Sequence, residues 1–349
     1  PNPDPCLPCM IRLSDHIAAA GGWLSLEAFM QLALHHPQEG YYSSSIENIG
    51  QRGDFSTTPT LSPILAKAII AHWKEACSRC GRRLPLLEIG AGSGALAVKI
   101  LERLGFWNRL NTDYVIVESS PRLREFQDLL LGGRAKIYST MEKALKHCGG
   151  KAFIFSNELV DAFPARVFEY TEQDWKEVGL VVKNGAVREE LRPVRQQPLF
   201  SHMLEYGSQP GQRVEIHDSY ARWFTSWLPH WNMGVMTVID YGDEMERLYY
   251  RRPRGSLRGY KSHQVLTGEE LYRNPGLTDL TCDVNFTDLL ELSRNCLGDR
   301  VTFMTQRDYL LPHAENTPQD AFLTDEYGAG GHFHVLIQER QRLQPEGFQ

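Results

Sequence analysis

The sequence of 349 residues lacks two features that would each define a class of protein. No apolar run approaches the roughly 20 residues that a membrane-spanning helix needs. Basic residues are not in excess, because 37 Lys and Arg stand against 43 Asp and Glu and give a formal net charge of −6. That balance argues against non-specific binding to nucleic acid. With 42% hydrophobic and 23% charged residues, the composition is that of an ordinary globular protein without membrane insertion or a nucleic-acid partner.

Cysteine is scarce, and its number is odd: the chain has seven. A chain of this length does not need disulfides to fold, so we expect a reducing compartment. Two C-x-x-C pairs, Cys6/Cys9 and Cys77/Cys80, could offer four thiolates to zinc, but they lie much farther apart than the roughly 15–20 residues of a zinc ribbon. We therefore predict no metal site. Residues 1–10 lack the basic and apolar stretches of a signal peptide, and repeats and low-complexity segments are absent.

Glycine, in contrast, is concentrated at one place. The apolar run 86–89 is followed by Gly90-Ala91-Gly92-Ser93-Gly94 and then by a helix-forming stretch at 95–101. This order predicts a buried strand, a tight turn and a helix, with glycines where the backbone needs positive φ or where a ligand approaches closely. The first turn of the helix offers unpaired N–H groups and a positive dipole end. The pattern predicts a site for a nucleotide-like cofactor.

The identity of that cofactor depends on two acids. Gly90, Gly92 and Ala95 fit the dinucleotide fingerprint, and Glu118 follows at about the expected interval of roughly 20 residues. This alternative is an NAD(P)-dependent oxidoreductase. Glu88, however, lies two residues before the first glycine, where a carboxylate would repel a pyrophosphate and attract a cationic ligand. Together with the three alternating glycines, it favours S-adenosylmethionine over a dinucleotide, and a structural turn without ligand is the least favoured interpretation.

Hydrophobic periodicity predicts an alternation of helices and strands. We expect helices at 13–20, from Ser25, and at 64–77, 95–101, 121–131, 219–228 and 286–297. Strands are expected at 86–89, 114–118, 135–138, 152–155, 235–240, 301–306 and 333–338. Residues 166–194 alternate with period two around the turn signal Lys183-Asn184-Gly185, which indicates an antiparallel insertion. Seven strands alternating with helices predict a doubly wound α/β sheet.

Further polar residues follow the strand at 152–155. Ligands bind at the carboxyl ends of parallel strands, so Asn157, Glu158 and Asp161 are expected near the glycine turn. If 158–161 begins a helix, Glu158 and Asp161 lie on one face of it. The helix dipole alone also favours acids there, so a purely structural role stays open. The polar stretch 49–59, which contains Asp54, Thr57 and Thr58, is either a connector or part of the site.

Together these motifs resemble the MidA-like class I methyltransferases, the family of the mitochondrial NADH:ubiquinone oxidoreductase assembly factor 7 and its bacterial relatives. The resemblance is carried by Gly40-Tyr41-Tyr42, residues 53–59, residues 88–94, Asn157-Glu158, Asp161-Ala162, Pro164, residues 239–242, Leu257-Arg258, His263, Asp279-Leu280-Thr281 and Val284-Asn285-Phe286. Cys282-Asp283 departs from it, because the family often has small residues or histidine there.

The resemblance implies a Rossmann-like class I methyltransferase sheet of seven strands with the last one antiparallel. It implies a helical cover with a substrate or cofactor loop at 1–82 and a methyltransferase domain at 83–349, with insertions at about 165–230 and 243–285. The implied donor is S-adenosyl-L-methionine, and the implied acceptor is an arginine of a protein, such as a subunit of respiratory complex I. The implied compartment is the cytoplasm in a bacterium or the mitochondrial matrix in a eukaryote. A SAM-binding assembly factor without catalysis is the alternative.

Methyl-transfer chemistry then assigns roles to these residues. Arginine stays protonated at neutral pH, so a carboxylate must orient it and accept its proton. The predicted catalytic residues are Glu158, Asp161 and Asp54. The predicted donor-binding residues are Gly90, Ala91, Gly92 and Gly94 around the methionine and ribose, Glu118 at the ribose hydroxyls, Glu88, Thr57 or Thr58 at the amino-acid end, and also Ser119 and Asn157.

Overall fold

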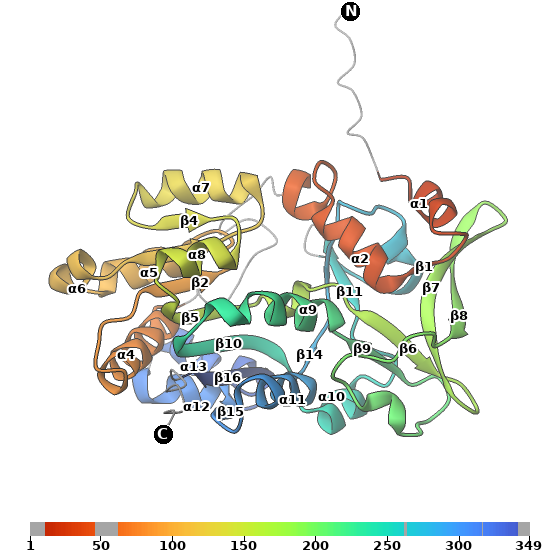
Figure 1. Cartoon of the computed structure of the whole chain (residues 1–349). Helices are drawn as coiled ribbons and strands as arrows, with labels where there is room; N and C mark the ends of the chain where they lie inside the picture. The colour runs from red at the N-terminus through yellow and green to blue at the C-terminus, as the bar shows by residue number, and fades with distance from the viewer. Residues whose placement is uncertain (1–10, 46–61, 262–263, 316, 341–349) are drawn as a thin grey trace, which may run out of the picture. The chain divides into compact units, whose positions relative to one another are not determined.

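The computed structural model describes residues 11–45, 62–261, 264–315 and 317–340 (Figure 1). Its contacts divide the chain into two compact units. The antiparallel unit comprises Pro1–Asn48, Val160–Ala221 and Glu244–Asp288. The central-sheet unit comprises Ile49–Leu159, Arg222–Asp243 and Leu289–Gln349. The chain therefore enters each unit more than once, as expected for a domain with insertions.

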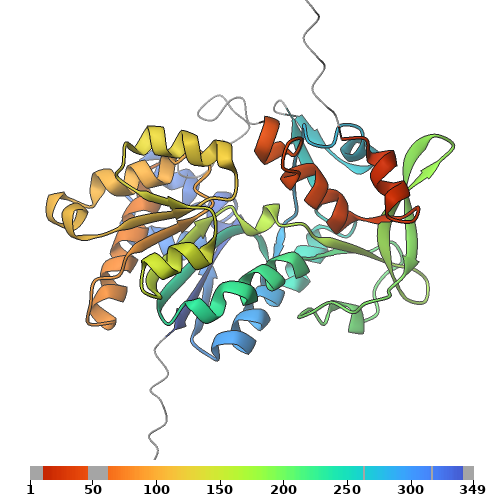
Figure 2. The same ribbon diagram turned by 45° about the horizontal axis from the view of Figure 1, so that its top comes forward.

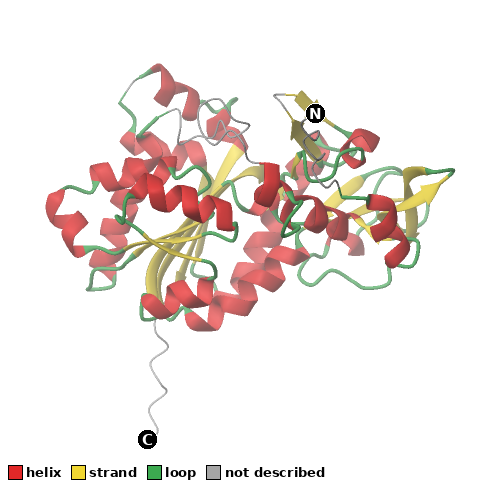
Figure 3. Ribbon diagram, turned by 90° about the horizontal axis from the view of Figure 1, so that it is seen from above, coloured by secondary structure: helices red, strands yellow, loops and turns green. Residues whose placement is uncertain are grey.

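Seven strands of the central-sheet unit form one continuous path, and Figure 3 shows this sheet from one edge with its strands in yellow. They are β2 (Leu86–Ile89), β3 (Tyr114–Val117), β4 (Lys136–Tyr138), β5 (Lys151–Asn157), β10 (Met233–Asp243), β15 (Val301–Thr305) and β16 (Phe333–Arg340). The order is β15-β16-β10-β5-β2-β3-β4. β2 pairs in parallel with β3 and β5, whereas β16 runs antiparallel to both β10 and β15. The predicted sheet of seven strands with the last one antiparallel is confirmed.

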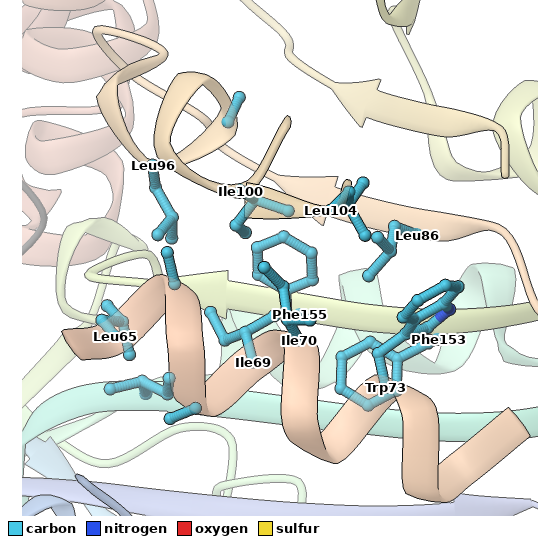
Figure 4. Close-up of a cluster of buried hydrophobic side chains, with 14 of the residues drawn as sticks. Leu65, Ile69, Ile70, Trp73, Leu86, Leu96, Ile100, Leu104, Phe153 and Phe155 are labelled. Atoms are coloured by element: carbon cyan, nitrogen blue, oxygen red, sulfur yellow. The ribbon is translucent and has the colours of Figure 1, made fainter. Parts of the chain in front are cut away.

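Helices α4 (Ile64–Arg79) and α5 (Ala95–Arg103) cover one face of this sheet. Their buried side chains recur every three or four residues and meet those of β2 and β5 in one hydrophobic cluster (Figure 4). Trp73 of α4 also donates its indole N–H to the carbonyl of Leu84, just before β2, at 2.8 Å. Each of these large side chains contributes about 1.5–3 kcal/mol by burial, so α4 is a fixed part of the sheet unit.

The other helices and strands have the following bounds. The helices are α1 (Leu13–Ala19), α2 (Leu26–His35), α6 (Phe106–Asn111), α7 (Pro121–Leu131), α8 (Met141–His147), α9 (Asp218–Trp227), α10 (Met245–Arg251), α11 (Phe286–Leu297), α12 (Gln306–Leu310), α13 (Pro318–Leu323) and α14 (Ala329–His332). The strands are β1 (Leu24–Ser25), β6 (Arg166–Tyr170), β7 (Trp175–Lys183), β8 (Ala186–Pro193), β9 (Arg213–Ile216), β11 (Arg258–Lys261), β12 (Gln264–Leu266), β13 (Asp279–Thr281) and β14 (Val284–Asn285).

The antiparallel unit contains two small sheets, which can be followed in Figure 2. One has the order β1-β7-β6-β9 with β8 beside β7, and the other has the order β12-β11-β13. Asn184 and Gly185 both have positive φ, 52° and 74°, as the predicted hairpin between β7 and β8 requires. Arg166 of β6 is buried and bonds Glu177 at 2.9 Å and Asp218 at 3.1 Å, which ties β6 to β7 and to the start of α9. The predicted antiparallel insertion is confirmed.

The division of contacts differs from the expected boundary between residues 82 and 83. The N-terminal segment in the antiparallel unit ends at Asn48, and α4 belongs to the central-sheet unit because its apolar face packs on β2 and β5. Helical periodicity identified α4 correctly, but it carries no information on which sheet the helix covers.

Candidate active site

The glycine turn follows β2 as predicted. Gly90, Gly92 and Gly94 have φ values of 66°, 51° and 70°, which side-chain-bearing residues rarely adopt. A Cβ added to Gly90 would lie 2.7 Å from Cδ1 of Leu159, whereas one added to Gly92 would meet no atom of the described residues within 4 Å. The backbone at Gly92 is therefore open to close approach by a ligand. The turn is anchored by the N–H of Gly90, which donates to the carbonyl of Val117 at the end of β3 at 2.8 Å.

Glu118 lies directly after β3 and is brought to the same turn. It is only 6% exposed, and its Oε1 accepts the N–H of Ser120 at 2.9 Å. The guanidinium of Arg124 donates to the carbonyls of Glu118 and Ser119 at 2.9 and 2.7 Å, which fixes the backbone here. Burial raises the pKa of Glu118 above its usual range. The role expected of Glu118 at the ribose hydroxyls stays a prediction.

A residue that the sequence analysis missed connects these two features. Gln127 of α7 is fully buried, and its Nε2 donates to the carbonyl of Gly92 at 3.0 Å and to Oε2 of Glu118 at 3.4 Å. The signal in the sequence is a polar residue in an apolar stripe, since the other buried side chains of α7 are Leu123 and Leu131.

Glu88 has different hydrogen-bond partners from Glu118. It is 3% exposed in β2, and its Oε2 accepts the phenolic O–H of Tyr114 at 2.6 Å. Burial raises the pKa of Glu88 to about 7, although the hydrogen bond from Tyr114 acts in the opposite direction. Its described partner is therefore a side chain of β3, and its expected role at the amino-acid end of the donor stays a prediction.

Glu88→Gln is expected to change how stability depends on pH. The ordinary pKa of 4.5 is raised to about 7 by folding, so the unfolded chain ionises first and stability is lost as pH rises from 4.5 to 7. The loss due to this group is at most about 3 kcal/mol, and glutamine removes it. The melting temperature of the variant, measured relative to the natural protein, should therefore increase between pH 5 and pH 7.5. A constant difference would contradict the buried, protonated Glu88.

The end of β5 carries two of the residues predicted to follow the strand at 152–155. Nδ2 of Asn157 donates to Oε1 of Glu158 at 3.0 Å. Glu158 has φ of 53°, a left-handed conformation that costs a non-glycine residue about 1–2 kcal/mol. The N–H of Glu158 donates to the carbonyl of Ile239 at 2.9 Å, so β10 contributes to holding it there.

Asp240 completes this arrangement from β10. It is fully buried, and its Oδ2 accepts the N–H of Leu159 at 3.0 Å while its Oδ1 accepts the N–H of Tyr241 at 2.9 Å. The carboxylate thus fixes the chain on the C-terminal side of Glu158. Sequence reasoning noted Asp240 only as part of the family pattern and gave it no role.

The helix that would have put Asp161 on one face with Glu158 does not form. The only helical turn here is the 3-10 turn Val160–Ala162, and the left-handed backbone places Glu158 outside it. Asp161 belongs to the antiparallel unit, where its Oδ2 accepts the hydroxyl of Thr281 at 2.7 Å and its carbonyl accepts the N–H of Cys282 at 3.0 Å. A helix does not start at residue 158 because the pairing between β5 and β10 extends the strand geometry to Asn157.

Some predicted residues lie outside the described residues: Asp54, Thr57, Thr58, Cys6 and Cys9. Cys80 is the C-cap residue of α4. Within the described ranges, no group of three or more His, Cys, Asp or Glu could hold a metal ion. None of the helices in that part of the chain is long and apolar enough to cross a membrane.

The residues of the central-sheet unit fit an adenosyl cofactor. Glu118 has a buried carboxylate, a group of the kind that binds ribose hydroxyls, and no described atom would block a ligand at the Cα of Gly92. Oδ1 of Asn157 is buried and has no hydrogen-bond partner in the described part of the chain. These groups follow the carboxyl ends of β2, β3 and β5, which are neighbours in the sheet. The antiparallel β16 between β10 and β15 differs from the strand order described for dinucleotide-binding sheets, which are mostly parallel.

A comparison with family models decides between the two cofactors. The model of S-adenosyl-L-methionine-dependent methyltransferases known as Methyltransf_28 matches residues 64–304. The chain belongs to this family. The cofactor is therefore S-adenosyl-L-methionine, and the activity is methyl transfer from it. The dinucleotide-dependent oxidoreductase is not supported.

Individual relatives agree with this assignment. The chain is 26% identical to the protein arginine methyltransferase NDUFAF7, mitochondrial, of Xenopus tropicalis, covering 83% of this chain and 71% of the relative. It is 28% identical to the protein of the same name in Danio rerio, covering 84% and 75%. A crystal structure from Burkholderia thailandensis, bound to S-adenosyl-homocysteine, has a TM-score of 0.80 and 25% identity and covers 94% of this chain and 90% of that one.

Proposed function

We propose that this methyltransferase modifies an arginine side chain of a protein. The proposal is supported by the names of the relatives, which are protein arginine methyltransferases. The observation that carries it in this chain is the carboxylate of Glu158, which a strained backbone holds beside the glycine turn, one strand away. A guanidinium needs a carboxylate at this place, both to pair with its positive charge and to accept its proton.

The chemistry required of the protein follows from the acceptor. A guanidinium has a pKa above about 12, so its nitrogen becomes nucleophilic only as a proton leaves. Glu158 would orient the guanidinium by charge-assisted hydrogen bonds and accept that proton. Asp161, and Asp54 outside the described residues, stay proposed as further carboxylates. The bound donor supplies an electrophilic methyl group, and the enzyme contributes mainly alignment.

The proposed donor contacts are those of the sequence analysis. Gly90, Ala91, Gly92 and Gly94 would line the methionine and ribose, with Ser119 and Asn157 nearby. Glu118 would accept the ribose hydroxyls, for which it is suitably buried. Glu88, Thr57 or Thr58 would hold the amino-acid end.

The finer identity of the acceptor is part of the proposal. Following the family resemblance, we propose a subunit of a respiratory complex I-type enzyme. The relatives are named as mitochondrial proteins, which supports the matrix as the compartment in a eukaryote. For a bacterial source, the cytoplasm is the corresponding proposal.

The test is to incubate the protein with methyl-labelled donor and an extract of its own source, then to map the labelled residue by mass spectrometry. We expect label on an arginine of one subunit, and none with a chain carrying Glu158→Gln. Label on a different residue type would overturn arginine as acceptor. Binding of S-adenosylhomocysteine without any transfer would favour the alternative of an assembly factor that only binds the donor.

A further inference from the structure

The buried face of α7 contains an amide where a leucine would be expected. Leu123, Gln127 and Leu131 are its buried residues and follow each other at intervals of four, so they form one stripe. Gln127 is 0% exposed. Burying an amide costs free energy unless its hydrogen bonds are made, so its presence in this stripe needs a reason. The hydrogen bonds of Gln127 supply one.

Both neighbours of the Gln127 side chain are acceptors. Nε2 lies 3.0 Å from the carbonyl oxygen of Gly92 and 3.4 Å from Oε2 of Glu118. An amide nitrogen carries two hydrogens, so it can donate to both at once. The opposite orientation of the amide would place its oxygen against two other acceptors, which is repulsive. The environment therefore dictates which end of the amide faces the turn.

In this orientation the amide oxygen of Gln127 is left without a described hydrogen-bond donor. Oε1 of Gln127 is buried and has no hydrogen-bond partner in the part of the chain that the structure describes. An unsatisfied buried acceptor is unfavourable, and an apolar side chain of the same size would avoid it. Stability of the fold alone therefore does not explain glutamine at this position.

We infer that Gln127 is a positioning residue for the methyl donor, acting through Glu118 and Gly92. It joins the turn after β2 to the acid after β3 and thereby sets the direction in which the Glu118 carboxylate can accept ribose hydroxyls. Oε1 of Glu118 is already bonded to the N–H of Ser120, so Gln127 fixes the other oxygen. This inference rests on the proposed assignment of Glu118 to the donor and is independent of the acceptor.

The experiment measures affinity for S-adenosylhomocysteine by calorimetry, with the melting temperature of each variant. Gln127→Met keeps the volume and removes both donors, and it should weaken binding about tenfold with little change in melting temperature. Glu125→Gln on the exposed side of α7 is the matched control and should bind normally. Glu118→Ala tests the donor site itself and should weaken binding.

A second variant gives a readout that a packing role would not produce. Gln127→Glu can donate one hydrogen bond when protonated, but when ionised it places a second carboxylate beside Glu118 and the Gly92 carbonyl. Its affinity should therefore approach that of the natural protein at pH 6 and fall more than tenfold below it at pH 8.5. Other charges acting here are Arg124, on the carbonyl of Glu118, and Glu88, whose charge interacts with that of Glu118.

The outcomes distinguish the positioning role of Gln127 from the assignment of Glu118 to the donor site. Normal affinity for Gln127→Met, or a pH-independent Gln127→Glu, together with weakened Glu118→Ala, would overturn the role of Gln127 and leave the donor site intact. Unchanged affinity of Glu118→Ala would remove the donor-site assignment and the inference with it. Neither result bears on arginine as the acceptor, which the labelling experiment tests.

Discussion

Replacing Glu158 with glutamine is expected to reduce methyl transfer by about 10²–10⁴-fold while leaving donor affinity unchanged. The amide has the same shape, and its oxygen can still accept the hydrogen bond from Nδ2 of Asn157. It cannot accept a proton from the guanidinium, and it lacks the charge that orients this group. Initial rates of label transfer to the mapped acceptor, with calorimetry of S-adenosylhomocysteine, measure both quantities.

The control for this variant is Glu102→Gln. Glu102 is an exposed acid of α5 in the same unit, so it tests the effect of losing a negative charge without touching the site. Its rate should match that of the natural protein. If Glu158→Gln transferred label at a normal rate, the carboxylate would not be the proton acceptor. A loss of rate caused only by weaker donor binding would assign Glu158 to the donor instead.

Much of the central sheet could be predicted because local patterns determine it. The glycines after 86–89 require positive φ, and the three have it. The alternation of 166–194 around Asn184 and Gly185 requires a hairpin, which forms between β7 and β8. The position of β16 between β10 and β15, in contrast, is not determined by a local pattern. Strands buried on both faces have similar apolar patterns wherever they pair, so the sequence did not predict this order, and the family resemblance implied only that the last strand is antiparallel.

In the candidate site, too, features set by local sequence could be predicted and features set by tertiary contacts could not. The relation between Gly92 and Glu118 follows from the spacing of a strand, turn and helix repeat. The conformation of Glu158 does not, because a left-handed glutamate exists only where tertiary hydrogen bonds from β10 compensate for its strain. The helix considered for residues 158–161 therefore does not include Glu158. Gln127 could have been found in advance, as a polar residue in the apolar stripe of α7.

Asp240→Asn is expected to lower both stability and turnover, because the strained conformation of Glu158 depends on Asp240. Each oxygen of the carboxylate accepts a different backbone N–H, from Leu159 and from Tyr241. An asparagine has one oxygen, so one of these N–H groups would face the NH₂ of the amide instead. A buried donor without an acceptor costs about 1–3 kcal/mol, which thermal unfolding should show as a lower melting temperature. Released from one hydrogen bond, the chain at Glu158 should relax towards right-handed φ, and turnover should fall at least about tenfold.

A double mutant distinguishes positioning of Glu158 from general damage. If Asp240 acts through Glu158, Asp240→Asn should cost turnover in the natural background but add little once Glu158→Gln is present, since the group that it positions has already lost its function. A purely destabilising effect would reduce the rate by the same factor in both backgrounds. Affinity for S-adenosylhomocysteine should stay normal in both single variants, because the glycine turn is anchored by β3, through the hydrogen bond from Gly90 to Val117. Additive losses of turnover would contradict the coupling, and Asp240 would then stabilise the ends of β5 and β10 without directing Glu158.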